Sequence, residues 1–371
     1  MIDTKPLHWE KLEKDFKDGR STVLFLGTGV NFGPQDKDFS WDALINHLLK
    51  YAISRITRNG EEDIASLLNN SASKLISESG YNGKILDNGE KYEKLKRQIA
   101  TDTIFSRDVK TTIVKQKLGN EVYVDLIREF LYNEVSRERL EKSVVDFVNK
   151  NYRKAPSDKE IKVEFSSLMC ITDLILRNKN IRAVITQNYD RFLCDAMEKM
   201  MVNPIYISKL KKDKGIDVRK IVPSTICDWK GQSKFTYDAI NIYHVHGFIP
   251  RYDEIQAPKD NKIVLSMDEF YEDSRNVYSW QIASQLHFLS QYTCIFCGLS
   301  LDDYTNQRLL HYVRGKHHGN LYYLTAASNA NGGTNDRIKN EFHEKNGLTV
   351  LYDEEGFGHL YNLLKDLQYE Y

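Results

Sequence analysis

Short apolar runs recur along the chain and stop at glycine or at polar residues. The clearest are residues 23–26, which stop at a Gly-Thr-Gly turn, and residues 181–186, which stop at a polar cluster. An unbroken apolar run bounded in this way is typical of a parallel strand that is buried on both faces. Further strands are expected at residues 241–247, 262–267, 292–300, 320–325 and 347–352.

Between these runs, apolar residues recur every three or four positions, which predicts amphipathic helices. One helix is expected to begin at Trp41, with Ser40 as its N-cap and a continuous apolar face. Other helices are expected at residues 7–18, 165–178, 190–201, 279–290, 302–314 and 358–371. Strands that alternate with helices predict an α/β fold, here a Rossmann-like, doubly wound parallel sheet.

The segment 55–165 interrupts this alternation. It is highly charged, poor in Gly and Pro, and rich in helical patterns such as VYVDLIREFLYNEV. We predict a mostly helical insertion, acting as a lid or an assembly surface, in a core formed by residues 1–54 and 166–371. Its polar stretch at 69–94 is expected to be a mobile loop or lid. Outside the insertion, residues 209–220 are expected to form a solvated hairpin.

Composition narrows the function classes. Lys+Arg and Asp+Glu balance at 52 each, so no global field draws this chain of 371 residues to nucleic acid or to an anionic membrane. Five cysteines, an odd number, favour reduced thiols over a disulfide framework. No run approaches the ~18 apolar residues that span a bilayer. We therefore expect a cytoplasmic protein that binds neither nucleic acid nor membrane.

Polar residues follow directly on the predicted strand at 181–186. The side chains concerned are Thr186, Gln187, Asn188 and Asp190. Open α/β sheets bind ligands at the carboxyl ends of their strands, so this cluster is a candidate site. A structural interpretation competes with the functional one, because Asn and Asp also cap helices and a helix is predicted to begin here. Taken alone, the cluster favours the capping role.

Two other strand ends carry candidate groups. Gly27, Thr28 and Gly29 could bring backbone N–H groups close to a pyrophosphate, although a structural turn explains the glycines equally well. In the sequence YHVHG, His246 stands directly before a glycine at the strand tip. His244 has the same parity but lies further from the functional edge.

The strand at 292–300 ends in a third group of this kind. Gly298, Ser300 and Asp303 lie at its exit, and the serine and the aspartate also match a helix cap. Cys294 and Cys297 on this strand have an odd separation, so they should face opposite sides of the sheet. The chain has no second C-x-x-C pair, and we expect no metal site.

In their order along the chain, FLGTGVN, ITQNYD, YHVHG and CGLSLDD resemble the motifs of the sirtuin-like (silent-information-regulator-like) NAD-consuming domains. The chain lacks the four-cysteine zinc ribbon of the sirtuin deacylases. It is similar instead to the bacterial antiphage effectors of this group, which hydrolyse NAD to nicotinamide and ADP-ribose and so starve the infected cell (abortive infection). The resemblance covers both ends of the chain and its second half, and it excludes the insertion.

This resemblance implies roles for individual residues. The NAD-binding positions would be Gly27, Thr28, Gly29, Asn31, Thr186, Gln187, Gly298, Ser300 and Asp303. Asn188 would orient the ribose and a water molecule, and His246 would act as general base, aided by an unperturbed pKa of about 6.5. Asp190 would hold the nicotinamide carboxamide or the local loop. Ser300, with Asp303 behind it, would anchor the adenosine ribose.

Other functions stay open at this point. An NAD-dependent deacylase would use the same residues with an acylated co-substrate, and a sensing module would bind NAD or ADP-ribose without cleaving it. A toxic NADase must be held inactive until infection, which implies a homo-oligomer, a phage-derived trigger or a partner. By family analogy, that partner is a HerA-type ATPase or helicase from the same operon. The sequence does not distinguish NAD from NADP.

Overall fold

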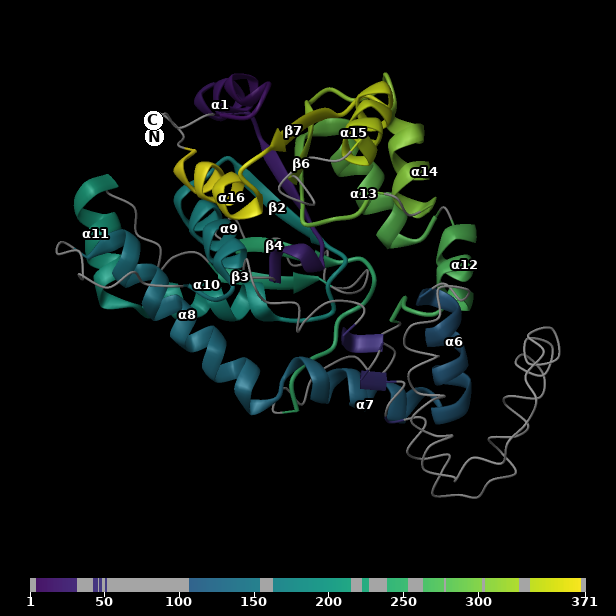
Figure 1. Ribbon diagram of the computed structural model, residues 1–371. Coiled ribbons are helices and arrows are strands. Elements are labelled where there is room, and N and C mark those ends of the chain that lie inside the picture. The colour runs from purple at the N-terminus through teal and green to yellow at the C-terminus, as the bar shows by residue number, and fades with distance from the viewer. Residues whose placement is uncertain are drawn as a thin grey trace. The chain divides into compact units, whose positions relative to one another are not determined.

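The structure is a computed structural model that describes most of the chain (Figure 1). The described residues are 5–31, 43–45, 47–48, 51, 107–153, 163–214, 222–226, 239–252, 263–276, 278–301, 304–326 and 334–367. The chain divides into two compact units. The first comprises residues 1–40, 131–264 and 271–371, and the second comprises residues 41–130 and 265–270.

A seven-stranded sheet forms the centre of the first unit. Every strand pairing is parallel, and the order is β3-β4-β2-β1-β5-β6-β7. The strands are β1 (Thr22–Leu26), β2 (Ile181–Thr186), β3 (Val222–Ile226), β4 (Ala239–His244), β5 (Thr293–Cys297), β6 (Leu321–Ala326) and β7 (Thr349–Asp353). The predicted Rossmann-like α/β fold is confirmed, with β1 at the point where the strand order turns from one side to the other.

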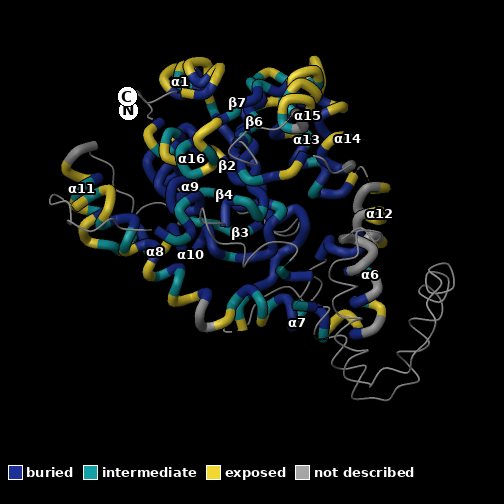
Figure 2. Tube along the Cα trace, in the orientation of Figure 1, coloured by how far each residue is buried: buried dark blue, intermediate teal, exposed yellow. Residues whose placement is uncertain are grey.

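Helices cover both faces of this sheet. One face packs on α13 (Trp280–Gln291) and α14 (Tyr304–Val313), whose apolar residues join those of the strands in one buried cluster. Among the helices packed on one another elsewhere in this unit are α9 (Ser166–Arg177), α10 (Phe192–Val202) and α16 (Phe357–Asp366). The central strands β1 and β5 are buried along their whole length, and β2 and α9 are almost wholly buried (Figure 2).

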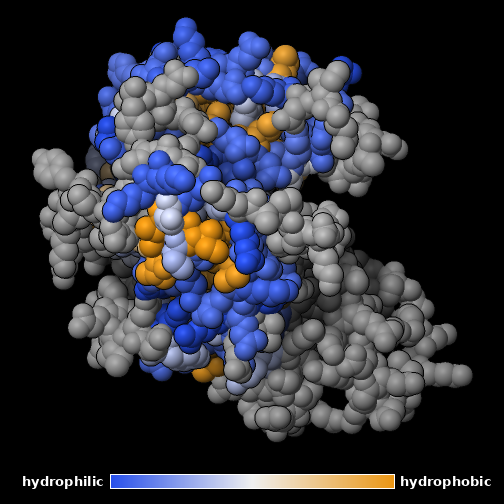
Figure 3. All heavy atoms as spheres, turned by 90° about the vertical axis from the view of Figure 1, so that its left-hand side faces the viewer, coloured by the Kyte–Doolittle hydropathy of each residue, from blue (hydrophilic) through white to orange (hydrophobic). Residues whose placement is uncertain are grey.

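The remaining helices of the first unit lie around this core. They are α1 (Trp9–Lys17), the 3-10 helix η1 (Thr28–Asn31), α8 (Glu134–Tyr152), α11 (Pro204–Lys214) and α15 (Thr334–Lys345). Apolar side chains gather on one face of the molecule among hydrophilic ones (Figure 3). The large exposed apolar residues on α8, α10 and α11 are Val145, Val202 and Ile205.

The second unit is helical where it is described. It contains α6 (Arg107–Leu118) and most of α7 (Asn120–Leu131), while α12 (Met267–Arg275) begins in it. Glu269 ties this unit together, because its Oε2 accepts hydrogen bonds from the backbone N–H groups of Leu265 and Ser266 and its Oε1 pairs with Lys115. Residues 107–152 of the predicted insertion are thus largely helical. The predicted domain boundaries remain a prediction.

Residues 262–267 were expected as a strand, but residues 263–265 have no regular structure and a helix begins at Met267. The hairpin expected at 209–220 is wrong for residues 209–214, which complete α11. The loop or lid at 69–94 lies outside the described residues. β3 was not predicted. It is an edge strand that contains Pro223, and proline is tolerated at a sheet edge.

No helix in the described ranges is long and apolar enough to span a membrane.

A buried polar cluster around Asp173 joins α8, α9 and α11. The Tyr152 and Tyr206 hydroxyls donate to its Oδ1 at 2.5 and 2.7 Å, and Arg177 Nε donates to its Oδ2 at 3.0 Å. Burial and the charge of Asp173 raise the pKa of both tyrosines, so the hydroxyls keep their protons.

We expect Asp173→Ala to lower the free energy of unfolding by about 3–5 kcal/mol, because it leaves the buried Arg177 guanidinium without its carboxylate. Urea unfolding followed by circular dichroism measures this. The control is Glu341→Ala, which removes an ion pair to Lys345 between side chains 63% and 72% exposed. It should change stability by less than about 1 kcal/mol. Equal effects of the two changes would contradict a structural role for Asp173.

Candidate functional site

Three glycines from two turns pack backbone against backbone where β1 and β5 end. Gly27 N–H donates to the Cys297 carbonyl and Gly29 N–H to the Gly298 carbonyl, both at 3.0 Å. A Cβ on Gly27 would lie 2.5 Å from Gly298 O, and one on Gly298 would lie 2.5 Å from Val30 N. Gly298 also has φ +62°. The glycines are therefore required by this close approach, in addition to any role toward a phosphate.

The chain leaving β2 docks onto the same turn. Asn188 Nδ2 donates to the Gly27 carbonyl at 3.2 Å, and the Asn188 backbone N–H is held by Thr186 Oγ1 at 3.0 Å. Gln187 points elsewhere and donates to Asn306 Oδ1 of α14 at 3.0 Å. The exits of β1, β2 and β5 are thereby brought together, as the parallel sheet predicts.

Asp190 both binds the start of α10 and lines the small cavity of the site. Its Oδ1 accepts the backbone N–H of Phe192 in the first turn of α10 at 3.0 Å, and its Oδ2 accepts Asn31 Nδ2 at 2.8 Å. Burial raises the pKa of Asp190 to about 6, although both hydrogen bonds oppose the rise. The carboxylate thus gains or loses its proton near neutral pH.

Two histidines lie at the end of β4, and both are buried. His244 is the last residue of the strand, and its Nδ1 lies 2.8 Å from the Asn188 carbonyl. His246 is in the turn that follows, and its own carbonyl accepts the Val264 N–H at 2.8 Å. Burial lowers the pKa of each imidazole to about 4. Both rings are therefore neutral at pH 7 and able to accept a proton, as weaker bases than an exposed histidine.

Two buried polar atoms in this region have no hydrogen-bond partner among the described residues. They are Asn188 Oδ1 and His244 Nε2, on side chains that are 5% and 2% exposed. A buried acceptor left unsatisfied costs about 1–3 kcal/mol, so such atoms are normally satisfied by water or a ligand. His244 is a residue that the sequence did not assign. Its parity with His246 was visible, but its bond to Asn188 depends on the packing of β2 against β4.

A small cavity of about 10 Å³ adjoins these atoms. It is lined by residues from the ends of β1, β2 and β4 and from η1, α9 and α10: Leu26, Val30, Asn31, Leu168, Thr186, Asn188, Asp190, Leu193, Cys194, Ile242 and His244. A space of this size holds about one water molecule. The lining includes Asn188, Asp190, Thr186 and Asn31 of the predicted site but neither His246 nor Ser300.

Ser300 does not line this cavity; it is an exposed residue between the buried Leu299 and Leu301 after β5. Its carbonyl is 3.5 Å from Asn306 Nδ2, and Asn306 in turn binds Gln187, so Ser300 is linked indirectly to the β2 exit. Asp303 and its predicted partnership with Ser300 lie outside the described residues. The cysteines of β5 face opposite sides as expected: Cys294 joins the cluster under α13, and Cys297 lies near Tyr361 of α16. In the part of the chain that the structure describes, no three His, Cys, Asp or Glu side chains are placed to hold a metal ion.

Comparison with known families adds an independent observation. Residues 182–351 match the family model of the SIR2-like domain. Over these residues the chain is similar to a SIR2-like domain. The match begins in β2 and ends in β7, so it contains the β2 exit, the histidine turn and the glycine turn after β5.

The SIR2-like domain supports a sirtuin-like function involving NAD, which this family binds. A search of curated proteins finds no match. The resemblance drawn from the sequence motifs is confirmed at the level of the domain. The assignments of individual site residues remain predictions.

We expect Gly298→Ala to lower the free energy of unfolding by about 2–4 kcal/mol, because the new Cβ would meet the backbone of Val30 at a positive φ. Thermal unfolding measures the loss. The matched control is Gly315→Ala, where φ is +68° and a Cβ would meet nothing within 4 Å. It should cost only about 1–2 kcal/mol. A smaller loss at Gly298 than at Gly315 would contradict the close packing of the two turns.

The buried histidines predict a stability that depends on pH. Both have a folded pKa of about 4, below the unfolded value of about 6.5. Between these two pKa values only the unfolded chain binds the extra protons. The contribution of the neutral histidines to the free energy of unfolding is therefore complete above about pH 6.5 and is lost as the pH falls toward 4. His244→Asn, which keeps a donor for the Asn188 carbonyl, should reduce the slope by up to about 1.4 kcal/mol per pH unit. Urea unfolding of both proteins from pH 4.5 to 7.5 measures this, and identical slopes would contradict the burial of a neutral His244.

Proposed function

We propose that the SIR2-like domain is an NAD glycohydrolase, which cleaves NAD to nicotinamide and ADP-ribose. The observation that supports this most is the pair of unsatisfied buried acceptors, Asn188 Oδ1 and His244 Nε2, beside the Asp190 carboxylate at the turning point of a parallel sheet. Ribose hydroxyls and a water molecule are the donors that such acceptors require. The match to a SIR2-like domain supports NAD as the ligand.

The polar groups of the site suit this substrate, although the small cavity is much smaller than a dinucleotide. The amide and imidazole acceptors suit a ribose, and a buried carboxylate whose pKa is about 6 can accept the amide N–H of nicotinamide. The cavity of about 10 Å³ holds far less than a dinucleotide. The cavity therefore accommodates only a small part of the ligand, such as a water molecule beside the ribose.

Hydrolysis breaks the bond between the ribose C1′ carbon and the nicotinamide nitrogen. Nicotinamide leaves with the bonding electron pair, water forms the new C–O bond, and the reaction releases one proton. The transition state resembles an oxocarbenium ion, so catalysis depends on holding the ribose and placing the water. In this proposal Asn188 orients the ribose and the water, and His246 accepts the proton.

Two further residues position the substrate and Asn188 in this proposal. Asp190 holds the nicotinamide carboxamide. His244 is a positioning residue, because its Nδ1 contact fixes the Asn188 backbone while its Nε2 can accept a ribose hydroxyl. The other predicted NAD contacts are retained as part of the proposal: Gly27, Thr28, Gly29, Asn31, Thr186, Gln187, Gly298, Ser300 and Asp303.

The biological role that we propose is antiphage defence by abortive infection. It rests on the likeness of the motifs to the bacterial effectors and on the absence of a zinc ribbon from the sequence. Control of a toxic NADase would come from assembly into a homo-oligomer, from a phage-derived trigger, or from a HerA-type ATPase or helicase encoded nearby.

The first test is NAD consumption by the purified protein without any acyl peptide, with nicotinamide and ADP-ribose quantified. Asn188→Ala and His246→Ala should each lower kcat by about 10²–10⁴-fold, because each removes a group that acts in the transition state. His244→Asn should mainly raise KM. Lys345→Ala, on the exposed face of α15, should match the wild type. Circular dichroism checks that every variant is folded.

Three outcomes would overturn the proposal. Full activity in the Asn188→Ala, His246→Ala double variant would place the chemistry elsewhere. Nicotinamide release only after an acylated peptide is added would indicate a deacylase. NAD binding without turnover, in cells challenged with phage as well as in the purified protein, would indicate a sensing module.

A further inference from the structure

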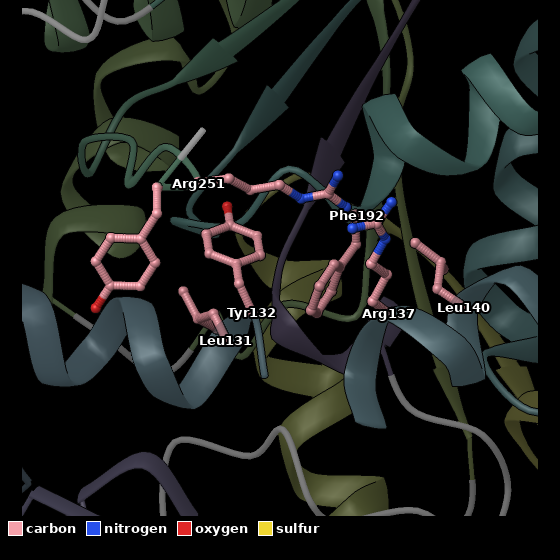
Figure 4. Close-up of a pocket in the computed structure, with 7 residues that line it drawn as sticks. Leu131, Tyr132, Arg137, Leu140, Phe192 and Arg251 are labelled. Atoms are coloured by element: carbon pink, nitrogen blue, oxygen red, sulfur yellow. The ribbon is translucent and has the colours of Figure 1, made fainter. Parts of the chain in front are cut away.

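A second, larger cavity of about 190 Å³ lies in the first unit. Its walls come from the end of α7, the beginning of α8, the start of α10 and the chain after β4: Leu131, Tyr132, Arg137, Leu140, Phe192, Arg251 and Tyr252. None of these residues lines the small cavity of the candidate NAD site. In the view of Figure 4 the guanidinium groups of Arg137 and Arg251 are directed toward one another near the Phe192 ring.

Two converging cations repel each other unless negative charge lies between or beside them. Arg251 pairs with Asp195, which Arg191 also pairs with at 2.8 Å. Arg137 lies 3.5 Å from Glu141, whose closer partner is Lys199 at 2.7 Å. The acids at this cavity are therefore each shared between two bases.

Two arginines bring their guanidinium groups to one cavity. Arg137 comes from α8 with a side chain that is 66% exposed, and Arg251 comes from the chain after β4. Planar guanidinium groups bind phosphate and carboxylate oxygens in a bidentate manner, so the two arginines together suit an anion of this type.

The aromatic walls are held rigidly. The Tyr132 hydroxyl donates to the Ile249 carbonyl at 2.6 Å and accepts the Arg191 backbone N–H at 3.0 Å. The Arg251 guanidinium lies 5.7 Å from the centre of the Tyr132 ring, and the Phe192 ring meets the same ring edge to face. Fixed aromatic surfaces beside cations are suited to stack on a planar ring.

We propose that this cavity binds a small phosphorylated compound that contains a planar ring, of the size of a nucleoside monophosphate. The phosphate lies between Arg137 and Arg251, and the ring packs on Tyr132 and on Tyr252 at the rim. The site is separate from the proposed NAD site and does not depend on the proposed reaction. It adjoins that site through the backbone of residues 189–192, since the Phe192 N–H binds Asp190 and the Ile249 N–H binds the Tyr189 carbonyl at 2.9 Å.

Isothermal titration with adenosine 5′-monophosphate tests the proposal. The wild type should bind this probe, and Arg137→Gln and Tyr252→Ala should each weaken binding at least 10-fold. Both changed side chains are largely exposed, so the variants should fold. The matched control is Lys142→Gln, which removes a charge from the exposed face of the same helix and should not change the affinity. Adenosine and inorganic phosphate alone should each bind at least 10-fold more weakly than the monophosphate.

The nucleotide could instead bind in the NAD site, and Asn188→Ala distinguishes the two. Unchanged affinity in that variant supports the second cavity. If Asn188→Ala abolishes binding while Arg137→Gln and Tyr252→Ala do not, the probe binds in the NAD site and the proposal is wrong. Absence of binding to the wild type at millimolar concentration would overturn it as well.

Discussion

The close contact between two glycine turns is the constraint on which the rest of the site depends. β1 and β5 are neighbours in the sheet, and both must turn out of it at the same edge. Backbone meets backbone there, with hydrogen bonds from Gly27 and Gly29 to the β5 exit, and no side chain fits between them. Side chains at these positions would force the turns apart, and the carbonyl of Gly27 would no longer be placed to receive Asn188.

This contact explains the glycine turn after β1 without a bound pyrophosphate. Glycines after the first strand are commonly explained by the approach of a pyrophosphate to the backbone. Here the N–H of Gly29 already donates to the Gly298 carbonyl. The neighbouring turn occupies the space that a Cβ atom on either glycine would need. The close approach of the two turns is therefore sufficient to account for Gly27 and Gly29. Support for NAD binding comes instead from the side chains at the exits of β2 and β4.

Much of the fold was predictable because buried parallel strands leave a strong signal. β1, β2 and β5 are fully or nearly fully apolar and are bounded by glycine or polar residues, so the bounds of β1 and β2 were found within one residue and those of β5 within three. Edge strand β3 left no such signal, because it is short and contains Pro223. The stretch 263–265 misled because it is buried and apolar without belonging to the sheet.

The site was predictable only in part, for a different reason. The polar cluster after β2 could be located, but sequence parity cannot tell which histidine of YHVHG approaches it. The structure brings His244 to Asn188 through the pairing of β2 with β4, a contact between residues 56 positions apart. For Asp190 the structure shows the contact with the start of α10, and its role toward NAD stays a prediction. One carboxylate oxygen binds the first residue of α10 and the other binds Asn31, so the start of the helix fixes the wall of the small cavity.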